Sequence, residues 1–238
     1  SYFNGHPVAK RIAIRVLPTL ELAGAALVIG TVLGVVFGVV AALRQYSVYD
    51  YALGFLSLIG LSIPVFFMAL IALFLLVFKL PLFPSHGMAS ELGAPFNLWD
   101  NLYHLFLPAF VLSIELLAVS TRFARTAMLE VLHSDYVTTA RAKGLSEFVV
   151  IGVHAGRNAL LPLITITTLR LPLLLGGAVV IETIFSWPGL GLLAIDSISQ
   201  RDYPTLMGLA FLVAALVLTS NLLADILYAY ADPRIRVA

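Results

Sequence analysis

The chain has no cysteine, which excludes a disulfide framework and any metal site built on thiolates. It is also poor in charge, since charged residues make up 11% of its 238 residues against about 25% in soluble domains. Hydrophobic residues make up 61% of the chain, which is more apolar surface than a soluble core of this length can hide. The composition therefore predicts a protein whose surface faces lipid.

Several sequence motifs of enzymes and nucleotide-binding proteins are missing as well. There is no Gly-x-x-x-x-Gly-Lys-Ser/Thr loop to hold the phosphates of ATP, no His-Glu-x-x-His and no Gly-x-Ser-x-Gly. No repeat and no basic patch with interleaved aromatic residues points to a nucleic acid. We therefore expect a chain that is not an enzyme and holds no metal or cofactor of its own.

Long apolar stretches are what the chain does contain. A bilayer core of about 30 Å needs about 20 apolar residues per helix. Five stretches meet that length: Leu17–Leu43, Ala52–Phe78, Leu102–Phe123, Leu160–Ile181 and Leu206–Tyr230. The predicted fold class is thus an all-α integral membrane protein with five transmembrane helices, in one domain over residues 1–238.

Glycine and proline mark local features of the first two stretches. Gly30, Gly34 and Gly38 recur every four residues, so another helix can approach this face closely, either in this chain or in a second subunit. Pro18 suits the start of a helix, and the basic segment Lys10–Arg15 before it suits a helix lying at the membrane interface. Pro64 should kink the second stretch.

The one long polar interval is residues 135–158, called the polar loop below. Asp135 suits an N-cap, and Gly144 can supply the left-handed end of a first short helix. Ser146 can cap a second short helix, with Glu147 at its positive end, that runs to about Ala155. Two short helices that meet at a glycine form a knob suited to docking a partner.

The distribution of Lys and Arg predicts the orientation. The basic residues expected on the side of the polar loop are Arg44, Arg122, Arg125, Arg141, Lys143, Arg157, Arg234 and Arg236. Those expected on the other side are Lys10, Arg11, Arg15, Lys79 and Arg201. Because the more basic side faces the cytoplasm, we expect the polar loop and the C-terminus to be cytoplasmic.

Three charged residues lie in or beside the predicted spans. Glu115 and Arg170 fall inside them, and Glu182 follows the fourth, so each must face protein or water rather than lipid. Arg170 has two interpretations: contact with a carboxylate of a ligand, or an ion pair with Glu115 or Glu182. Glu115 equally suits a cavity or a structural hydrogen bond.

Residues 183–205 are too apolar for a free loop and too short to span the membrane. Trp187, Pro188 and Gly189 favour a turn, and Leu192–Ser199 favours a short helix after it. Such a segment can dip back into the outer side of the membrane only where protein or water surrounds it. We expect it to form an outer gate or a seat for a delivery protein.

The polar loop resembles the EAA loop of ABC importer permeases, and the whole chain resembles the dipeptide/oligopeptide (and nickel) branch of that family. Thr138 and Thr139 replace the Glu and first Ala of that motif, so Ala140 and Gly144 carry the match. The segments that carry the rest of the resemblance are Leu161-Pro162, Thr19–Ala23, Glu182–Gly191, Arg201–Pro204 and Asp232–Arg236.

The resemblance implies a permease that forms half of an import path for short peptides in a bacterial cell membrane. Its implied partners are a homologous second permease, two cytoplasmic ATPases that carry ATP and Mg, and an extracytoplasmic binding protein. It also implies a sixth helix before this sequence. Contact with an ATPase is implied for Ala140, Arg141, Lys143, Gly144, Leu145, Ser146 and Glu147.

A second class of function fits the composition too. An ion-coupled carrier or channel that needs no ATPase would use Glu115, Arg170 and Glu182 as its coupling charges. Among importers, nickel chelates, opines, haem and glycans are alternatives to peptides.

Overall fold

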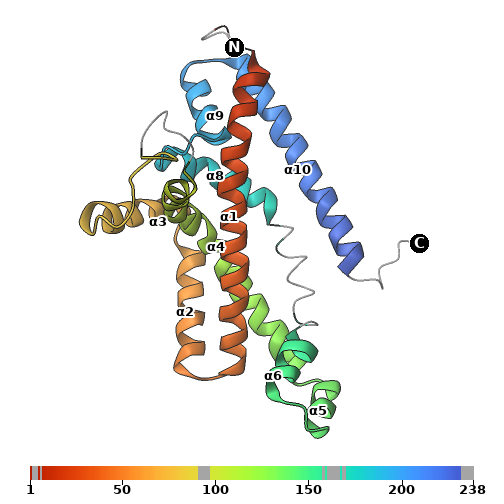
Figure 1. The fold of residues 1–238 in the computed structure, drawn as a ribbon. Coiled ribbons are helices and arrows are strands. Elements are labelled where there is room, and N and C mark those ends of the chain that lie inside the picture. The colour runs from red at the N-terminus through yellow and green to blue at the C-terminus, as the bar shows by residue number, and fades with distance from the viewer. Residues whose placement is uncertain are drawn as a thin grey trace. The chain divides into compact units, whose positions relative to one another are not determined.

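We describe the protein from a computed structural model, which covers residues 1, 5, 7–90, 97–156, 159, 167 and 170–231. Within these residues the regular structure is entirely helical, as predicted (Figure 1). The elements are α1 (Val8–Leu43), α2 (Val48–Ser62), α3 (Val65–Ala72), the π-helical η1 (Leu73–Lys79), α4 (Leu98–Leu132), α5 (Asp135–Ala142), α6 (Glu147–Val149), the π-helical η2 (Val150–Gly156), α8 (Leu171–Ile184), α9 (Leu190–Ser199) and α10 (Tyr203–Ala231).

Three of the described helices are long and apolar enough to cross a membrane, namely α1, α4 and α10. The count rises to four if the two helical pieces on either side of Pro64 form one broken span. The predicted stretch Leu160–Ile181 falls partly outside the described residues, and its described part from Leu171 onward lies in α8. The all-helical membrane fold is therefore confirmed, and the number of five spans stays a prediction.

Two predictions about helix boundaries were wrong. Pro18 lies inside α1 rather than at its start, and Lys10–Arg15 continues the same helix instead of forming a separate one. A proline within a helix removes one backbone hydrogen bond. The other hydrogen bonds of α1, which has 36 residues, are enough to keep the helix continuous through Pro18. At Pro64 the chain does more than kink, because α2 ends at Ser62 and Pro64 caps a new helix, α3.

The chain divides into two compact units, each built from three segments. The first unit comprises Ser1–Val28, Ile63–Ser113 and Leu171–Thr219. In it α8 packs against α9 and α3, and α9 buries Leu190 and Leu193 against Leu209 of α10. Arg11 forms an ion pair with the fully buried Asp202 at 2.6 Å, which joins the start of α1 to the turn before α10.

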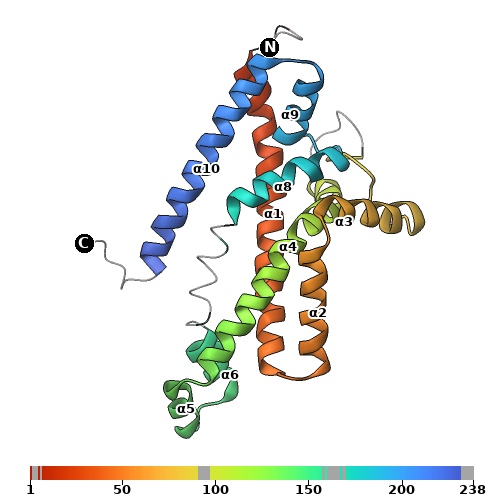
Figure 2. The same cartoon turned by 180° about the vertical axis from the view of Figure 1, so that it is seen from behind.

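The second unit comprises Ile29–Ser62, Ile114–Arg170 and Ser220–Ala238. The second part of α1 and α2 run side by side and are joined by a short turn (Figures 1 and 2). A Cβ atom added at Gly38 would lie 2.5 Å from Ala124 Cβ and 2.5 Å from Thr121 O, and one at Gly34 would lie 2.5 Å from Ser120 Cβ. At these two glycines the predicted close packing is therefore with α4 of the same chain.

Candidate functional site

The polar loop has a short helix on each side of Gly144, as its sequence predicts. The second one is α-helical only over Glu147–Val149 and continues as the π-helical η2 to Gly156. Ser134, rather than Asp135, occupies the N-cap of α5, so the prediction was one residue off. Gly144 has a φ of +76°, the left-handed conformation expected after α5, and Ser146 occupies the N-cap of α6. A Cβ atom at Gly144 would meet nothing within 4 Å, so only the backbone conformation favours glycine here.

One side of the polar loop is held by a hydrophobic cluster within its own unit. Val137, Ala140 and Val150 are buried there with Met128 of α4 and Ala42 of α1. Ala140 thus contacts its own chain, with only 6% of its surface exposed. Its predicted contact with an ATPase stays a prediction, and the alanine fits equally well as the support of the loop.

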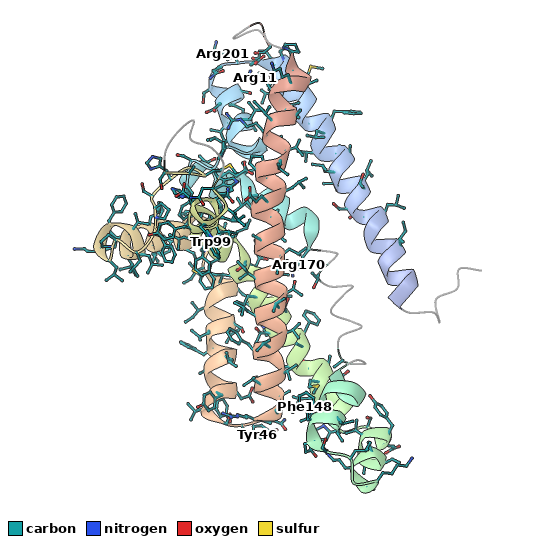
Figure 3. The ribbon with its side chains drawn as sticks, viewed as in Figure 1. Arg11, Tyr46, Trp99, Phe148, Arg170 and Arg201 are labelled. Carbon is teal, nitrogen blue, oxygen red and sulfur yellow. The ribbon has the colours of Figure 1, made fainter. Side chains whose placement is uncertain are left out.

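The other side of the polar loop is exposed. Arg141 and Glu147 form an ion pair across the turn, with Arg141 Nε 2.9 Å from Glu147 Oε1. Lys143, Leu145 and Ser146 are exposed beside them, and so is the aromatic ring of Phe148, which is 85% exposed (Figure 3). Sequence reasoning missed Phe148, although a phenylalanine in the one long polar interval was a signal.

The remainder of the expected motif lies outside the described residues. Arg157, Asn158, Leu161 and Pro162 all belong to that part of the chain. The described part of the polar loop ends at Gly156, the last residue of η2.

Arg170 forms an ion pair with Glu115, with Arg170 Nη1 3.0 Å from Glu115 Oε1. Of the two carboxylates predicted as partners, Glu115 is therefore the one that the structure brings to Arg170, and both side chains stay partly exposed, at 33% and 60%. Arg170 also lines a cavity of about 250 Å³ with Arg122 and the apolar side chains Leu61 and Val119. Two guanidinium groups on an apolar cavity suit a ligand that carries a carboxylate.

Glu182 is fully buried, and its carboxylate is bonded on both oxygens. Oε1 accepts a hydrogen bond from the Thr19 hydroxyl at 2.6 Å, and Oε2 accepts from the backbone N–H groups of Gly191 at 2.6 Å and Leu192 at 3.1 Å. The Thr19 hydroxyl in turn accepts the N–H of Leu190 at 2.8 Å. The first N–H groups of a helix have no partner within the helix, and here three of them at the start of α9 find acceptors in Glu182 and Thr19. The carboxylate also lies at the positive end of the helix dipole, which favours a negative charge.

The turn before α9 fits tightly around this carboxylate. A Cβ atom at Gly189 would overlap the Glu182 carboxylate, and one at Gly191 would overlap the backbone of Val179 in α8. Trp187 is fully buried, and its Nε1–H donates to the carbonyl oxygen of Pro18 at 2.8 Å. Glu182 and Trp187 therefore position the 183–205 segment, and their role in a gate stays a prediction.

Relatives of known sequence are close over almost the whole chain. The oligopeptide transport system permease protein AppB of Bacillus subtilis is 48% identical over 232 residues, which is 98% of this chain and 73% of that protein. The dipeptide transport system permease protein DppB of Escherichia coli is 40% identical over 250 residues, covering 97% of this chain and 74% of that protein. The di/tripeptide permease DppB of Pseudomonas aeruginosa is 46% identical, covering 92% and 70%.

A solved structure has the same fold. A chain of the MetNI methionine ABC transporter, in an inward-facing conformation, superposes with a TM-score of 0.75. The superposition covers 96% of this chain and 99% of that one, at 16% sequence identity. Residues 34–237 also match a family described as the inner membrane component of binding-protein-dependent transport systems. The chain therefore belongs to the family of inner membrane components of binding-protein-dependent transport systems, as its Ala140–Gly144 motif and apolar stretches predict.

Proposed function

We propose that the chain forms half of the translocation path of an importer for short peptides, and that separate cytoplasmic ATPases power it. Membership of an importer permease family favours this function over an ion-coupled carrier. The names of three close relatives support peptides as the substrate class, since each relative is called an oligopeptide, dipeptide or di/tripeptide permease.

The observation that carries the proposal is the two-sided polar loop. Val137, Ala140 and Val150 pack its buried side against α4. A displacement of the loop therefore moves a helix that is long enough to span the membrane. Its exposed side carries Phe148 next to Glu147, which is paired with Arg141. An exposed aromatic ring with a polar rim is the composition of a protein–protein contact.

In the proposed assembly each ATPase holds the polar loop of one permease in a groove. The partners are a homologous second permease, two ATPases that carry ATP and Mg, and an extracytoplasmic binding protein. With the five predicted spans, the polar loop and the C-terminus lie on the same side of the membrane, and the Lys and Arg distribution supports the cytoplasm as that side. Closure of the ATPases then moves the loop as a rigid body and switches the path between outward and inward access.

The path itself is proposed to run past Arg170 and Glu115. Their ion pair leaves both side chains partly exposed, so a carboxylate of a passing peptide can exchange with Glu115 at the guanidinium of Arg170. The 183–205 segment, positioned by Glu182 and Trp187, is proposed to close the outer end.

Crosslinking from a single introduced cysteine tests the docking. Because the 238 residues contain no cysteine, Phe148→Cys adds a single cysteine to this sequence, which can carry a maleimide–benzophenone probe. We expect this probe to crosslink an ATP-binding chain in the native membrane. Trp99→Cys is the matched control, since Trp99 is similarly exposed at 79% but belongs to the start of α4. A crosslink to an ATPase from position 99 and none from position 148 would overturn the proposal.

A further inference from the structure

A second hollow of the second unit lies between α2 and α4 and is called the α2–α4 groove below. It borders the Arg170 cavity and shares Arg122 and Thr126 with it. It has a volume of about 540 Å³, within the usual range for ligand sites. One end is polar and carries Tyr46, Asp50, Arg122 and Arg125. The other end is apolar and carries Gly54, Phe55 and Leu58.

The polar end has one positive charge to spare. Arg125 and Asp50 neutralise each other in a two-pronged ion pair, with Nε to Oδ1 at 2.6 Å and Nη2 to Oδ2 at 2.8 Å. Arg122 is exposed, and no carboxylate lies within ion-pair distance of it in the described part of the chain. The polar end therefore has a formal charge of +1, which complements a group with a single negative charge.

The apolar end follows the helix away from these charges. Phe55 and Leu58 are 64% and 53% exposed although they lie in a helix of the predicted second span. From Asp50 to Leu58 the helix rises by about 12 Å, close to the half-thickness of about 15 Å of a bilayer core. The groove thus has the length of one leaflet, with its charge at one end.

The aromatic residues place the polar end at the membrane surface. Tyr46 lies in the turn between α1 and α2 (Figure 3) and is 73% exposed. Tyr51 of α2 is 66% exposed. Tyrosine is enriched where the hydrocarbon core meets the headgroups, because its ring is apolar and its hydroxyl is polar. Basic pockets between membrane helices at this level bind lipid headgroups.

We propose that the α2–α4 groove binds one anionic glycerophospholipid, with its phosphate diester at Arg122 and the free Nη1 side of Arg125, and an acyl chain along Gly54, Phe55 and Leu58. A phosphate diester carries a single negative charge, which neutralises the formal charge of +1 at the polar end. The proposed orientation puts this lipid in the inner leaflet. The inference concerns lipid binding alone, so it can fail while the transport function stands.

Two variants separate headgroup recognition from groove shape. Arg122→Gln removes the spare charge without removing the Asp50–Arg125 pair. Gly54→Leu fills the apolar end and changes no charge. The helix should tolerate it, because a Cβ atom at Gly54 would meet nothing within 4 Å and leucine has a higher helix propensity than glycine. Arg44→Gln is the control for general surface charge, since Arg44 lies at the same turn but stacks on Tyr49 and does not line the groove.

The test uses the purified permease complex in phosphatidylcholine nanodiscs with increasing phosphatidylglycerol, and native mass spectrometry counts the retained lipid. For Arg122→Gln we expect about fivefold weaker phosphatidylglycerol retention, equivalent to about 1 kcal/mol for one basic residue. Gly54→Leu should reduce retention to a similar extent, and Arg44→Gln should behave as the unsubstituted protein. Free glycerol phosphate should not displace the lipid, because it lacks the acyl chain.

Other outcomes overturn the proposal. Equal losses in Arg44→Gln and Arg122→Gln would reduce the effect to general surface charge. Unchanged retention in both Arg122→Gln and Gly54→Leu, or no preference of the unsubstituted complex for phosphatidylglycerol, would show that the groove is not a site for an anionic lipid. Recovery of the complete complex in each preparation shows that a variant has folded and assembled.

Discussion

Gly144→Val changes the backbone at the junction of α5 and α6 and removes no described side-chain contact. The φ of Gly144 is +76°, and a Cβ atom there meets nothing within 4 Å, so the penalty is conformational rather than steric. An L-residue in the left-handed region costs roughly 1–2 kcal/mol, and a β-branched one lies at the upper end. About 2 kcal/mol lowers the equilibrium constant for forming the native turn by about 30-fold.

The loss should appear in coupling rather than in folding. The hydrophobic cluster around Val137, Ala140 and Val150 is unchanged, so we expect normal amounts of the chain in the membrane. ATP-dependent uptake of a labelled dipeptide by the reconstituted complex should fall at least about tenfold, given the shift in turn population. Uptake and membrane content are measured on the same vesicles.

Two controls isolate the turn. Gly144→Asn should keep most of the uptake, because asparagine tolerates the left-handed conformation. Gly152→Val places the same side chain in the same loop, at a glycine whose φ is not positive and whose added Cβ also meets nothing within 4 Å, so it should be mild. Normal uptake by Gly144→Val would refute the reasoning, and so would an equal loss in Gly152→Val.

Three further substitutions test other contacts. Arg170→Gln should leave the complex assembled and reduce the uptake of peptides with a free carboxylate more than that of their amides; failure of assembly would instead indicate that the Arg170–Glu115 pair is structural. Glu182→Ala leaves the buried N–H groups at the start of α9 without their acceptor. Thermal melts of the complex should therefore show a loss of stability of about 2 kcal/mol or more, and a smaller loss for Glu182→Gln. Equal melting temperatures would contradict this. Gly38→Leu forces α1 away from Ala124 of α4, so limited proteolysis should be faster than for Gly24→Leu, where an added Cβ meets nothing within 4 Å; equal rates would refute close packing at Gly38.

The features that were predictable from the sequence are those set by local chemistry. Ser146 as an N-cap and Gly144 as a left-handed end depend on neighbours within a few residues, so the polar loop was predicted to within one residue at its start. The four-residue spacing of the glycines likewise predicts close packing, because one helix face carries the signal. Membrane class followed from composition alone.

What the sequence could not provide are partners far apart in the chain. Glu182 bonds Thr19, which lies 163 residues away, and nothing in the local pattern distinguishes a buried cap from a charge on the path. The choice between Glu115 and Glu182 as the partner of Arg170 had the same difficulty. The prediction that a helix starts at Pro18 was wrong because proline is commoner at helix starts than inside helices, and α1 contains it in its interior.

The central claim is that this chain works as a permease beside separate ATPases. It is tested most directly by isolating the chain from its native membrane in mild detergent and assaying ATP hydrolysis on the eluate. The account predicts co-elution of a second permease and two ATP-hydrolysing chains. A lone or self-associated chain without ATPase activity that moves its substrate under an ion gradient would contradict it.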